Sequence, residues 1–208
     1  MNDVDPAELL KKLRRVEAIL AIQQLMNAYG QWLALFRADK IIPMFSTRAA
    51  DVSLETAAPG VFEGPEAIKS FFQFYSRAHA GAKGALVEHY AICPVIEIAP
   101  SGLEARGTWF SPGILASASE QMQCWNWGKY ACDFLKEPEG WKIWHLHWYP
   151  TFRARYELGW VREQQAPFAP PGAATELPRS GRPNTYRKPY SPDGVNYLLP
   201  EPPEPSGG

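Results

Sequence analysis

Three histidines are the residues of this sequence best suited to proton transfer. His145 and His147 stand two apart in the stretch WKIWHLHWYP, and His89 lies in LVEHYAICPVIEI. Imidazole titrates near neutral pH, so a histidine can serve as a general acid or a general base. We therefore take all three as candidate catalytic residues. The alternative for each is a hydrogen bond inside the folded core.

A metal site is another reading of the His-x-His pair. Catalytic zinc takes three protein ligands, and the only further histidines are His79 and His89. We expect a structural role for His79, because it falls near the end of a predicted helix, where a positive charge is favoured. The sequence has three cysteines, an odd number, and no two of them have the C-x-x-C spacing of a structural zinc site. No glycine-rich phosphate loop is present either. We therefore predict no metal site and no cofactor.

Tyr29 places a polar tip on an apolar helix stripe. Apolar side chains recur there at steps of three and four from Ile19 to Phe36, which predicts a helix face turned toward a core. A phenol on that face either hydrogen-bonds within the core or donates to charge that develops on a substrate oxygen. We take the second role as a prediction, so Tyr29 joins the candidate catalytic residues.

Aromatic side chains offer a binding surface for a molecule that contains rings. They make up 13% of the chain, and eight of them are tryptophan. Lys129 could bind a phenolate or an enolate-like charge, although a solvated ion pair with Asp133 is the alternative. One arginine of the FRAR stretch could also meet an anionic substrate group from the rim of a pocket. The predicted substrate-binding residues are Trp32, Trp109, Trp125, Trp127, Lys129 and Tyr149.

Helices in the first 80 residues and strands in the rest must position these side chains. Asp5 and Pro6 are typical of the start of a helix, and Gly64 with Pro65 opens another. A short helix is expected near IIPMFS, and DVSLET reads as a strand. From Leu86 the apolar period switches to two, which predicts strands. Helices followed by a run of strands are typical of an α+β domain. The long strands are predicted over residues 86–100, 102–115, 123–137 and 141–156.

The last of these strands is apolar on both faces. We therefore expect one face to line a pocket or core and the other to meet another subunit. If the histidine face points inward, it adds acid and base groups to the pocket. If it points outward, Tyr29 and His89 carry the chemistry alone. Period two groups Trp141, Ile143, His145, His147 and Tyr149 on one face and Lys142, Trp144, Leu146 and Trp148 on the other.

The composition changes near Arg162. Eleven of the twenty prolines follow that residue, and proline is excluded from helix interiors and from central strands. We predict a domain over residues 1–161 and a proline-rich C-terminal tail or arm over residues 162–208. The tail is either disordered or an extended arm that lies on a neighbouring subunit or over a pocket.

Bulk properties exclude several classes of partner. The net charge of -1 predicts no binding to nucleic acid or to an anionic membrane. No apolar run approaches the roughly 20 residues of a membrane span. The acidic start MNDVDPAELL lacks the apolar segment of a secretory signal, so we expect a cytoplasmic protein.

Several motifs, in this order, resemble the SnoaL-like branch of the nuclear transport factor 2-like superfamily. They are GVFEGPEAIKSFF, EHYAICPVIEI and GKYACDFLKEPEGWKIWHLHW, and the resemblance covers about Val16 to Tyr156. It implies a cone-shaped α+β barrel, in which a curved antiparallel sheet wraps a long first helix and two further helices help to enclose an apolar pocket. It also implies a pocket position for His89. Family dehydratases and cyclases often carry an aspartate close to the helix tyrosine, but no carboxylate follows Tyr29 at short range here.

The family includes scytalone dehydratase, ketosteroid isomerase, polyketide cyclases and bacterial diarylpropane lyases, so the fold alone does not give the function. We predict a cofactor-independent lyase that eliminates water, and also formaldehyde, from a lignin-derived diarylpropane by shuttling protons. Tryptophan richness suits such a two-ring substrate. A dehydratase, isomerase or cyclase of an aromatic polyketide-like molecule is one alternative. A non-catalytic aromatic-ligand-binding or accessory protein is the other, and it is favoured if the four candidate catalytic residues do not meet in one cavity. The expected partners are a small aromatic substrate and further copies of the chain, in a dimer or trimer.

Overall fold

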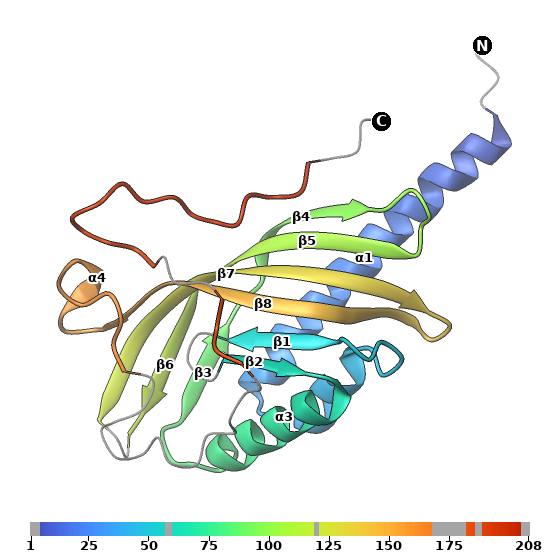
Figure 1. The fold of residues 1–208 in the computed structure, drawn as a ribbon. Coiled ribbons are helices and arrows are strands. Elements are labelled where there is room, and N and C mark those ends of the chain that lie inside the picture. Colours follow the sequence, from blue (N-terminus) through green and yellow to red (C-terminus); the bar gives the residue numbers. More distant parts are fainter. Residues whose placement is uncertain (1–4, 57–59, 119–120, 168–181, 186–188, 205–208) are drawn as a thin grey trace.

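The computed structural model describes residues 5–56, 60–118, 121–167, 182–185 and 189–204. Helices dominate the first part of the chain and strands the second (Figure 1). None of the helices in these ranges is long and apolar enough to cross a membrane. The helices are α1 (Pro6–Ala34), α2 (Ala38–Ile41), the 3-10 turn η1 (Ile42–Met44), α3 (Pro65–His79) and α4 (Gly159–Arg162). The strands are β1 (Ser53–Thr56), β2 (Gly60–Glu63), β3 (Leu86–His89), β4 (Ile92–Ile98), β5 (Glu104–Ser111), β6 (Gly113–Ser117), β7 (Met122–Glu137) and β8 (Gly140–Arg155).

Helix α1 begins where the sequence predicts. The Asp5 carboxylate accepts a hydrogen bond from the backbone N–H of Ala7, and Pro6 occupies the first helical position. The predicted stripe faces the core: Ile22, Met26 and Tyr29 are all buried. Their burial against the sheet fixes α1 along the axis of the domain.

The strands form one curved sheet that wraps around α1, with α3 next to β2 and β1 (Figure 1). Its main path runs β2-β1-β8-β7-β5-β4, and β6 joins β3 to β7. All neighbouring pairs are antiparallel except β1 and β8, which run parallel. The predicted α+β cone is therefore confirmed.

Two predicted long strands are each divided in two. The first breaks at Tyr90 and Ala91 between β3 and β4, and the second breaks at Pro112 between β5 and β6. Proline lacks the backbone donor that continues a ladder, which accounts for the second break. The register of β4 and β5 shifts between Ile92 and Val95, around Pro94, because proline lacks the backbone donor that the ladder needs. Strand β2 was not predicted, because its sequence GVFE lies between turn residues.

Two bulges in the β7–β8 hairpin overturn the predicted faces of the last strand. The register shifts between the pairs Asp133–His145 and Phe134–Ile143, so Trp144 is an extra residue on β8. A second shift makes Thr151 an extra residue. Because of the first bulge, Ile143 is buried in the same core as Leu146, whereas His145 lies on the opposite face. Strict alternation from Trp141 to Tyr149 is therefore wrong.

The C-terminal arm, described over residues 182–185 and 189–204, lies along the outer, convex face of the sheet (Figure 1). It starts beside β2, where Val61 N–H donates to Arg182 O, and it meets β8 where Tyr190 N–H donates to Thr151 O. It then reaches β7, where the Lys129 ammonium donates to the carbonyls of Leu198 and Pro200 at 3.1 and 2.5 Å. The arm therefore covers the outer face of the last strand, which the sequence predicts to meet another subunit.

Candidate active site

A cavity of about 90 Å³ lies between α1, α3 and the concave face of the sheet. Most of its wall is apolar, as is usual for a small-molecule site. Among its described lining residues Arg153 is the one permanent charge, and none of them is Asp or Glu. The lining residues are Tyr29, Leu33, Leu54, Thr56, Phe71, Tyr75, His79, Val87, His89, Leu115, Asn126, Tyr130, Leu146, Trp148 and Arg153.

His89, Asn126 and Arg153 form a hydrogen-bonded chain in the cavity wall. Arg153 Nε donates to Asn126 Oδ1 at 3.3 Å, and Asn126 Nδ2 lies 3.0 Å from His89 Nε2. Because Arg153 can only donate, it holds the Asn126 oxygen toward itself and turns the amide nitrogen toward His89. His89 Nε2 must then accept, which leaves the proton of the neutral imidazole on Nδ1.

The same surroundings keep His89 uncharged. Burial lowers its pKa from the ordinary value to about 3, and the positive charge of Arg153 lowers it further in the same direction. Burial also lowers the pKa of Arg153, to about 10, so the guanidinium stays charged at neutral pH. His89 is therefore a hydrogen-bond donor in the cavity wall, and its position makes it a poor base.

Two buried tyrosines face each other across this cavity wall. The rings of Tyr29 and Tyr130 meet edge to face with centroids 6.0 Å apart. Burial raises the pKa of both phenols, and for Tyr29 the neighbouring Tyr130 raises it further. Both are therefore neutral hydroxyl groups rather than phenolates.

Three cavity-lining polar atoms have no hydrogen-bond partner among the described residues. They are Thr56 Oγ1, His89 Nδ1 and Trp148 Nε1. The His89 and Trp148 rings meet edge to face at 5.2 Å. A buried donor without an acceptor costs roughly 1–3 kcal/mol. A ligand with acceptor oxygens would satisfy such donors, so the cavity favours an oxygen-bearing apolar molecule.

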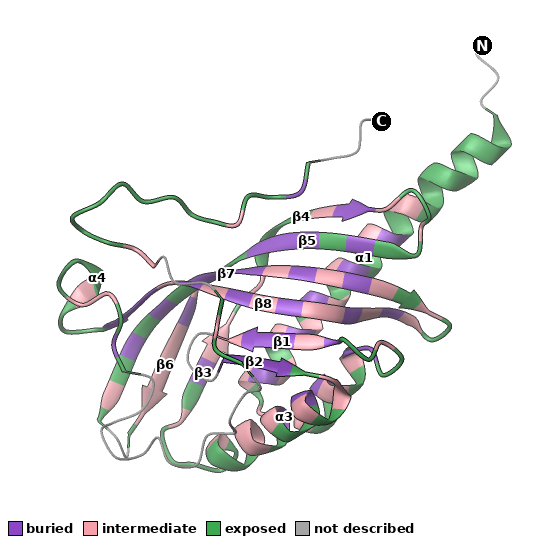
Figure 2. Cartoon of the chain, in the orientation of Figure 1, coloured by how far each residue is buried: buried purple, intermediate pink, exposed green. Residues whose placement is uncertain are grey.

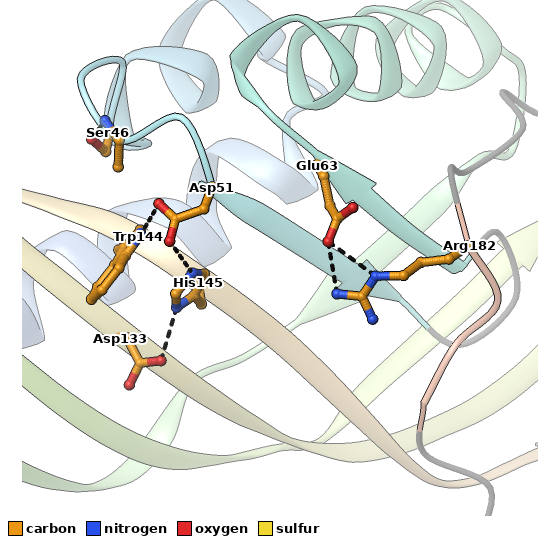
Figure 3. Close-up of polar contacts among 8 residues, drawn as sticks. Ser46, Asp51, Glu63, Asp133, Trp144, His145 and Arg182 are labelled. Carbon is orange, nitrogen blue, oxygen red and sulfur yellow. Dashed lines mark hydrogen bonds and ion pairs between the residues drawn. The ribbon is translucent and has the colours of Figure 1, made fainter.

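The histidines of β8 lie on the other side of the sheet. His145 sits between two carboxylates, with Nδ1 3.1 Å from Asp133 Oδ2 and Nε2 4.0 Å from Asp51 Oδ2 (Figure 3). The hydrogen bond to Asp133 raises its pKa above the ordinary value. His145 is therefore not among the residues that line the cavity.

His147 is covered by the C-terminal arm. Its Nε2 lies 3.1 Å from Glu55 Oε1, which also accepts hydrogen bonds from the backbone and the hydroxyl of Thr185. Its ring stacks on Tyr149 with centroids 3.7 Å apart. Burial lowers the pKa of His147 to about 4, against the opposing effect of Glu55. Of the four candidate catalytic residues, the structure thus brings together only Tyr29 and His89.

None of the six predicted substrate-binding residues lines the cavity. Trp109 is buried against Phe134, and Trp32 lies beside Arg37 near the end of α1. Trp125 and Trp127 are on the outer face, more than one third exposed at 36% and 37%. Lys129 and Tyr149 are also on that face. The Lys129 ammonium donates to the C-terminal arm and does not form the ion pair with Asp133 that was the alternative.

Asn126, Trp148 and Arg153 are cavity residues that were not predicted as site residues. Asn126 stands between Trp125 and Trp127, so the strand period did place it opposite those exposed rings. Arg153 belongs to FRAR, where an arginine for an anionic group was expected at a rim. It is 7% exposed and lies in the cavity wall instead.

The chain is similar to known proteins in both sequence and fold. Residues 14–147 match the family model described as the SnoaL-like domain. None of the curated proteins matches the chain. A solved structure from Novosphingobium aromaticivorans, named after scytalone dehydratase, has a TM-score of 0.60 at 18% identity, covering 74% of this chain and 95% of its own.

Two further solved structures share the fold. A type 2 hexachlorocyclohexane dehydrochlorinase has a TM-score of 0.58 at 16% identity, over 77% of this chain and 99% of its own. A type 3 form from Novosphingobium barchaimii has a TM-score of 0.58 at 14% identity, over 69% and 93%. At these identities the likeness shows the fold.

Proposed function

The chain belongs to the SnoaL-like family of the nuclear transport factor 2-like superfamily, and from that premise we propose that it is a cofactor-independent lyase. Its substrate is a small phenol with a hydroxyl leaving group on the benzylic carbon. The observation that carries this proposal is the donor-rich cavity. Arg153, His89 and Tyr29 lie in its mostly apolar wall, and none of the described lining residues is a carboxylate. The names of two similar structures, a dehydratase and a dehydrochlorinase, both denote eliminations.

Such a cavity suits an elimination in which the substrate supplies the driving electrons. Arg153 favours the ionised form of a bound phenol, because an opposite charge nearby lowers its pKa. The phenolate electrons move through the ring as the benzylic C–O bond breaks, which gives a quinone methide. Tyr29 donates the proton that turns the leaving hydroxide into water, while His89 Nδ1–H hydrogen-bonds to the departing oxygen.

The remaining step restores Tyr29. Where the neighbouring carbon bears a hydroxymethyl group, the Tyr29 phenolate takes its hydroxyl proton. The carbon–carbon bond then breaks toward the ring, which releases formaldehyde and an aromatic alkene. Our finer proposal is that the substrate is a lignin-derived diarylpropane. Trp148 is the one tryptophan among the described lining residues of the cavity, so the number of rings that the cavity accepts is tested directly below.

A substrate panel tests the elimination. The purified chain should convert 4-hydroxyphenyl compounds with a benzylic hydroxyl, followed by absorbance of the alkene and by formaldehyde release. The matched 4-methoxy compounds should not react, since they cannot form the phenolate. One-ring and two-ring members of the panel measure the size limit. Equal conversion of phenol and methyl ether would overturn the mechanism.

Variants of His89 separate a donor from a base. In His89→Asn the amide nitrogen keeps a donor near the Nδ1 position, so we expect most of kcat to survive. His89→Phe removes the donor and should lower kcat by roughly 100-fold, the scale of a single positioned donor. Equal loss in both variants would show that His89 is the base. His145→Gln, on the outer face, is the control and should leave kcat unchanged.

A binding protein without chemistry is the second candidate. It is favoured by the separation of His145 and His147 from Tyr29 and His89, and by the lack of a carboxylate among the described lining residues. Calorimetric binding of the phenols without turnover, at any pH between about 6 and 9, would support it. Loss of that binding in Arg153→Met would still place the ligand in this cavity.

A further inference from the structure

Helix α1 carries a second apolar stripe that its own chain does not cover. Leu9, Leu13, Val16 and Leu20 follow one another at steps of four, three and four residues. Their exposed fractions are 57%, 52%, 52% and 59%. We call these four residues the outer stripe. Their spacing is that of the a and d positions of a coiled coil, whose seam is completed only by another helix.

The outer stripe faces away from the domain. At about 100° per residue, the stripe lies roughly 150–170° around the helix from the core residues Ile22 and Ala18. The first turns of α1 also extend past the ends of β4, β5 and β7 (Figure 1). These turns are exposed along their length (Figure 2). A second helix can therefore lie on the outer stripe without touching the sheet.

The charges beside the outer stripe complement those of an identical helix in parallel. With Leu13 at an a position, Lys12 falls at g and Glu17 at e. In parallel coiled coils a g residue lies next to the e residue five positions on in the partner. Lys12 would thus meet Glu17 of a second copy. Because the two helices are equivalent, Glu17 of the first copy would also meet Lys12 of the second. Among the described residues, neither side chain has an ion-pair partner within its own chain.

We propose that two copies of the chain associate through the outer stripe of α1, with the helices parallel. The two domains then lie on opposite sides of the helix pair, because each core is on the far side of its own helix. The outer stripe does not include the cavity of the proposed lyase. Tyr29 is near the C-terminal end of α1, and both Tyr29 and His89 line the cavity.

Antiparallel helices fit less well. That arrangement brings Lys12 beside Ile19 and Glu17 beside Leu10 of the second copy, so neither charge gains an opposite charge. A membrane surface also fits less well, although Lys11 and Arg14 lie opposite the outer stripe, where an amphipathic membrane helix concentrates its cations. Here Arg15 is already bound to Glu97 of the same chain at 2.8 Å, and Glu17 flanks the stripe.

Molar mass in solution tests the surface. The full chain should shift from monomer to dimer as its concentration rises, measured by light scattering or sedimentation. Leu13→Gln/Leu20→Gln keeps good helix formers and should weaken association by at least about tenfold. Leu103→Gln is the matched control, because Leu103 is also 59% exposed but lies in the turn between β4 and β5. An unchanged mass profile for Leu13→Gln/Leu20→Gln would overturn the proposal.

Orientation is tested by charge exchange and by crosslinking. Lys12→Glu should weaken the dimer, and Lys12→Glu/Glu17→Lys should restore it. In a Cys93→Ser background, Val16→Cys should form a disulfide-linked dimer on oxidation, because a parallel pair sets each position beside its own copy. Crosslinking only in a mixture of Leu13→Cys and Val16→Cys chains would show antiparallel helices and reject the parallel arrangement. If anionic phosphatidylserine vesicles bind the chain and the Leu-to-Gln variant does not, while the mass never changes, the stripe is a membrane surface and the proposal fails.

Discussion

His89 owes its chemical character to Asn126 and Arg153, two neighbours that no local sequence pattern connects with it. Arg153 orients the Asn126 amide, and that amide in turn decides which imidazole nitrogen carries the proton. A histidine in an apolar strand could have been a base, an acid or a core residue. What distinguishes these roles is the identity of the hydrogen-bond partner, which comes from strands far apart in the sequence.

The proton position on His89 can be measured directly. We expect the ring of His89 to show a protonated Nδ1 and an unprotonated Nε2 in nitrogen-15 NMR spectra at neutral pH. In Asn126→Asp the new carboxylate accepts from Nε2, so the proton should move there and the histidine pKa should rise. A protonated Nε2 in the unmodified chain would contradict the tautomer derived from Arg153.

Burial of neutral His89 should also make stability depend on pH. Its folded pKa of about 3 is below the unfolded value near 6.5, so the unfolded chain takes up a proton first as the pH falls. The contribution is fully present above about pH 6.5 and is lost progressively down to about pH 3, by up to roughly 1.4 kcal/mol per pH unit. Urea unfolding at several pH values measures this slope.

His89→Asn removes the titrating group and should flatten the slope on the acid side. His145→Gln provides the contrast, because the pKa of His145 is raised. Its contribution is present below about pH 6.5 and is lost as the pH rises through the raised value, so the substitution should change the curve on the alkaline side. Identical acid slopes in the unmodified chain and His89→Asn would contradict the buried neutral state.

At the level of elements, the sequence foretold the helices better than the faces of the strands. The core stripe of α1 follows from the constant period of a helix. The start of α3 follows from Pro65, which occupies its first position. Strand alternation holds only until a bulge adds a residue. The extra residue Thr151 follows Pro150, which is typical of a bulge, but the extra residue Trp144 has no such neighbour. For that reason His145 was grouped with Ile143 although the two lie on opposite sides of the sheet.

Gly128 shows how tightly the β7–β8 hairpin is built at the second bulge. A Cβ at this position would lie 2.6 Å from Tyr149 O and 2.6 Å from Trp148 Cε2. Gly128→Ala should therefore displace Trp148 toward the cavity and destabilise the fold by roughly 1–3 kcal/mol, as overpacking does. Denaturant unfolding gives the stability change, and ligand affinity reports the cavity. Gly194→Ala, where a Cβ meets only Ser191 at 3.7 Å, should cost far less.

The whole molecule combines a predicted cone with an arm whose place was not predictable. The order of helices and strands pointed to the fold because each element signals itself locally. Spaced tyrosines and leucines between prolines could equally have belonged to a disordered tail. The arm's path depends on contacts with Val61, Thr151 and Lys129, which are distant in sequence.

Lys129 should hold the last part of the arm in place. Lys129 is 7% exposed, and its ammonium donates to two arm carbonyls, so Lys129→Met leaves both without this donor. Hydrogen bonds from a charged group are worth roughly 1.5–3 kcal/mol, so we expect at least tenfold faster opening of the arm. Limited proteolysis near residues 197–201 measures that opening. Lys142→Met, whose ammonium binds Pro43 O elsewhere, is the control and should leave arm cleavage unchanged.

The way in which the arm is held bears on how its sequence can evolve. From residue 190 to 200 the arm is held through main-chain atoms, at Tyr190, Leu198 and Pro200. Its earlier part is held through side chains as well: Arg182 pairs with Glu63, Asn184 donates to the carbonyl of Thr56, and Thr185 donates to Glu55. Any residue has a carbonyl, so substitutions can accumulate over residues 190–200 without changing the path of the arm there. In related genes we therefore expect natural selection to retain Lys129 on the sheet and the side chains at 182–185 long after residues 190–200 have diverged.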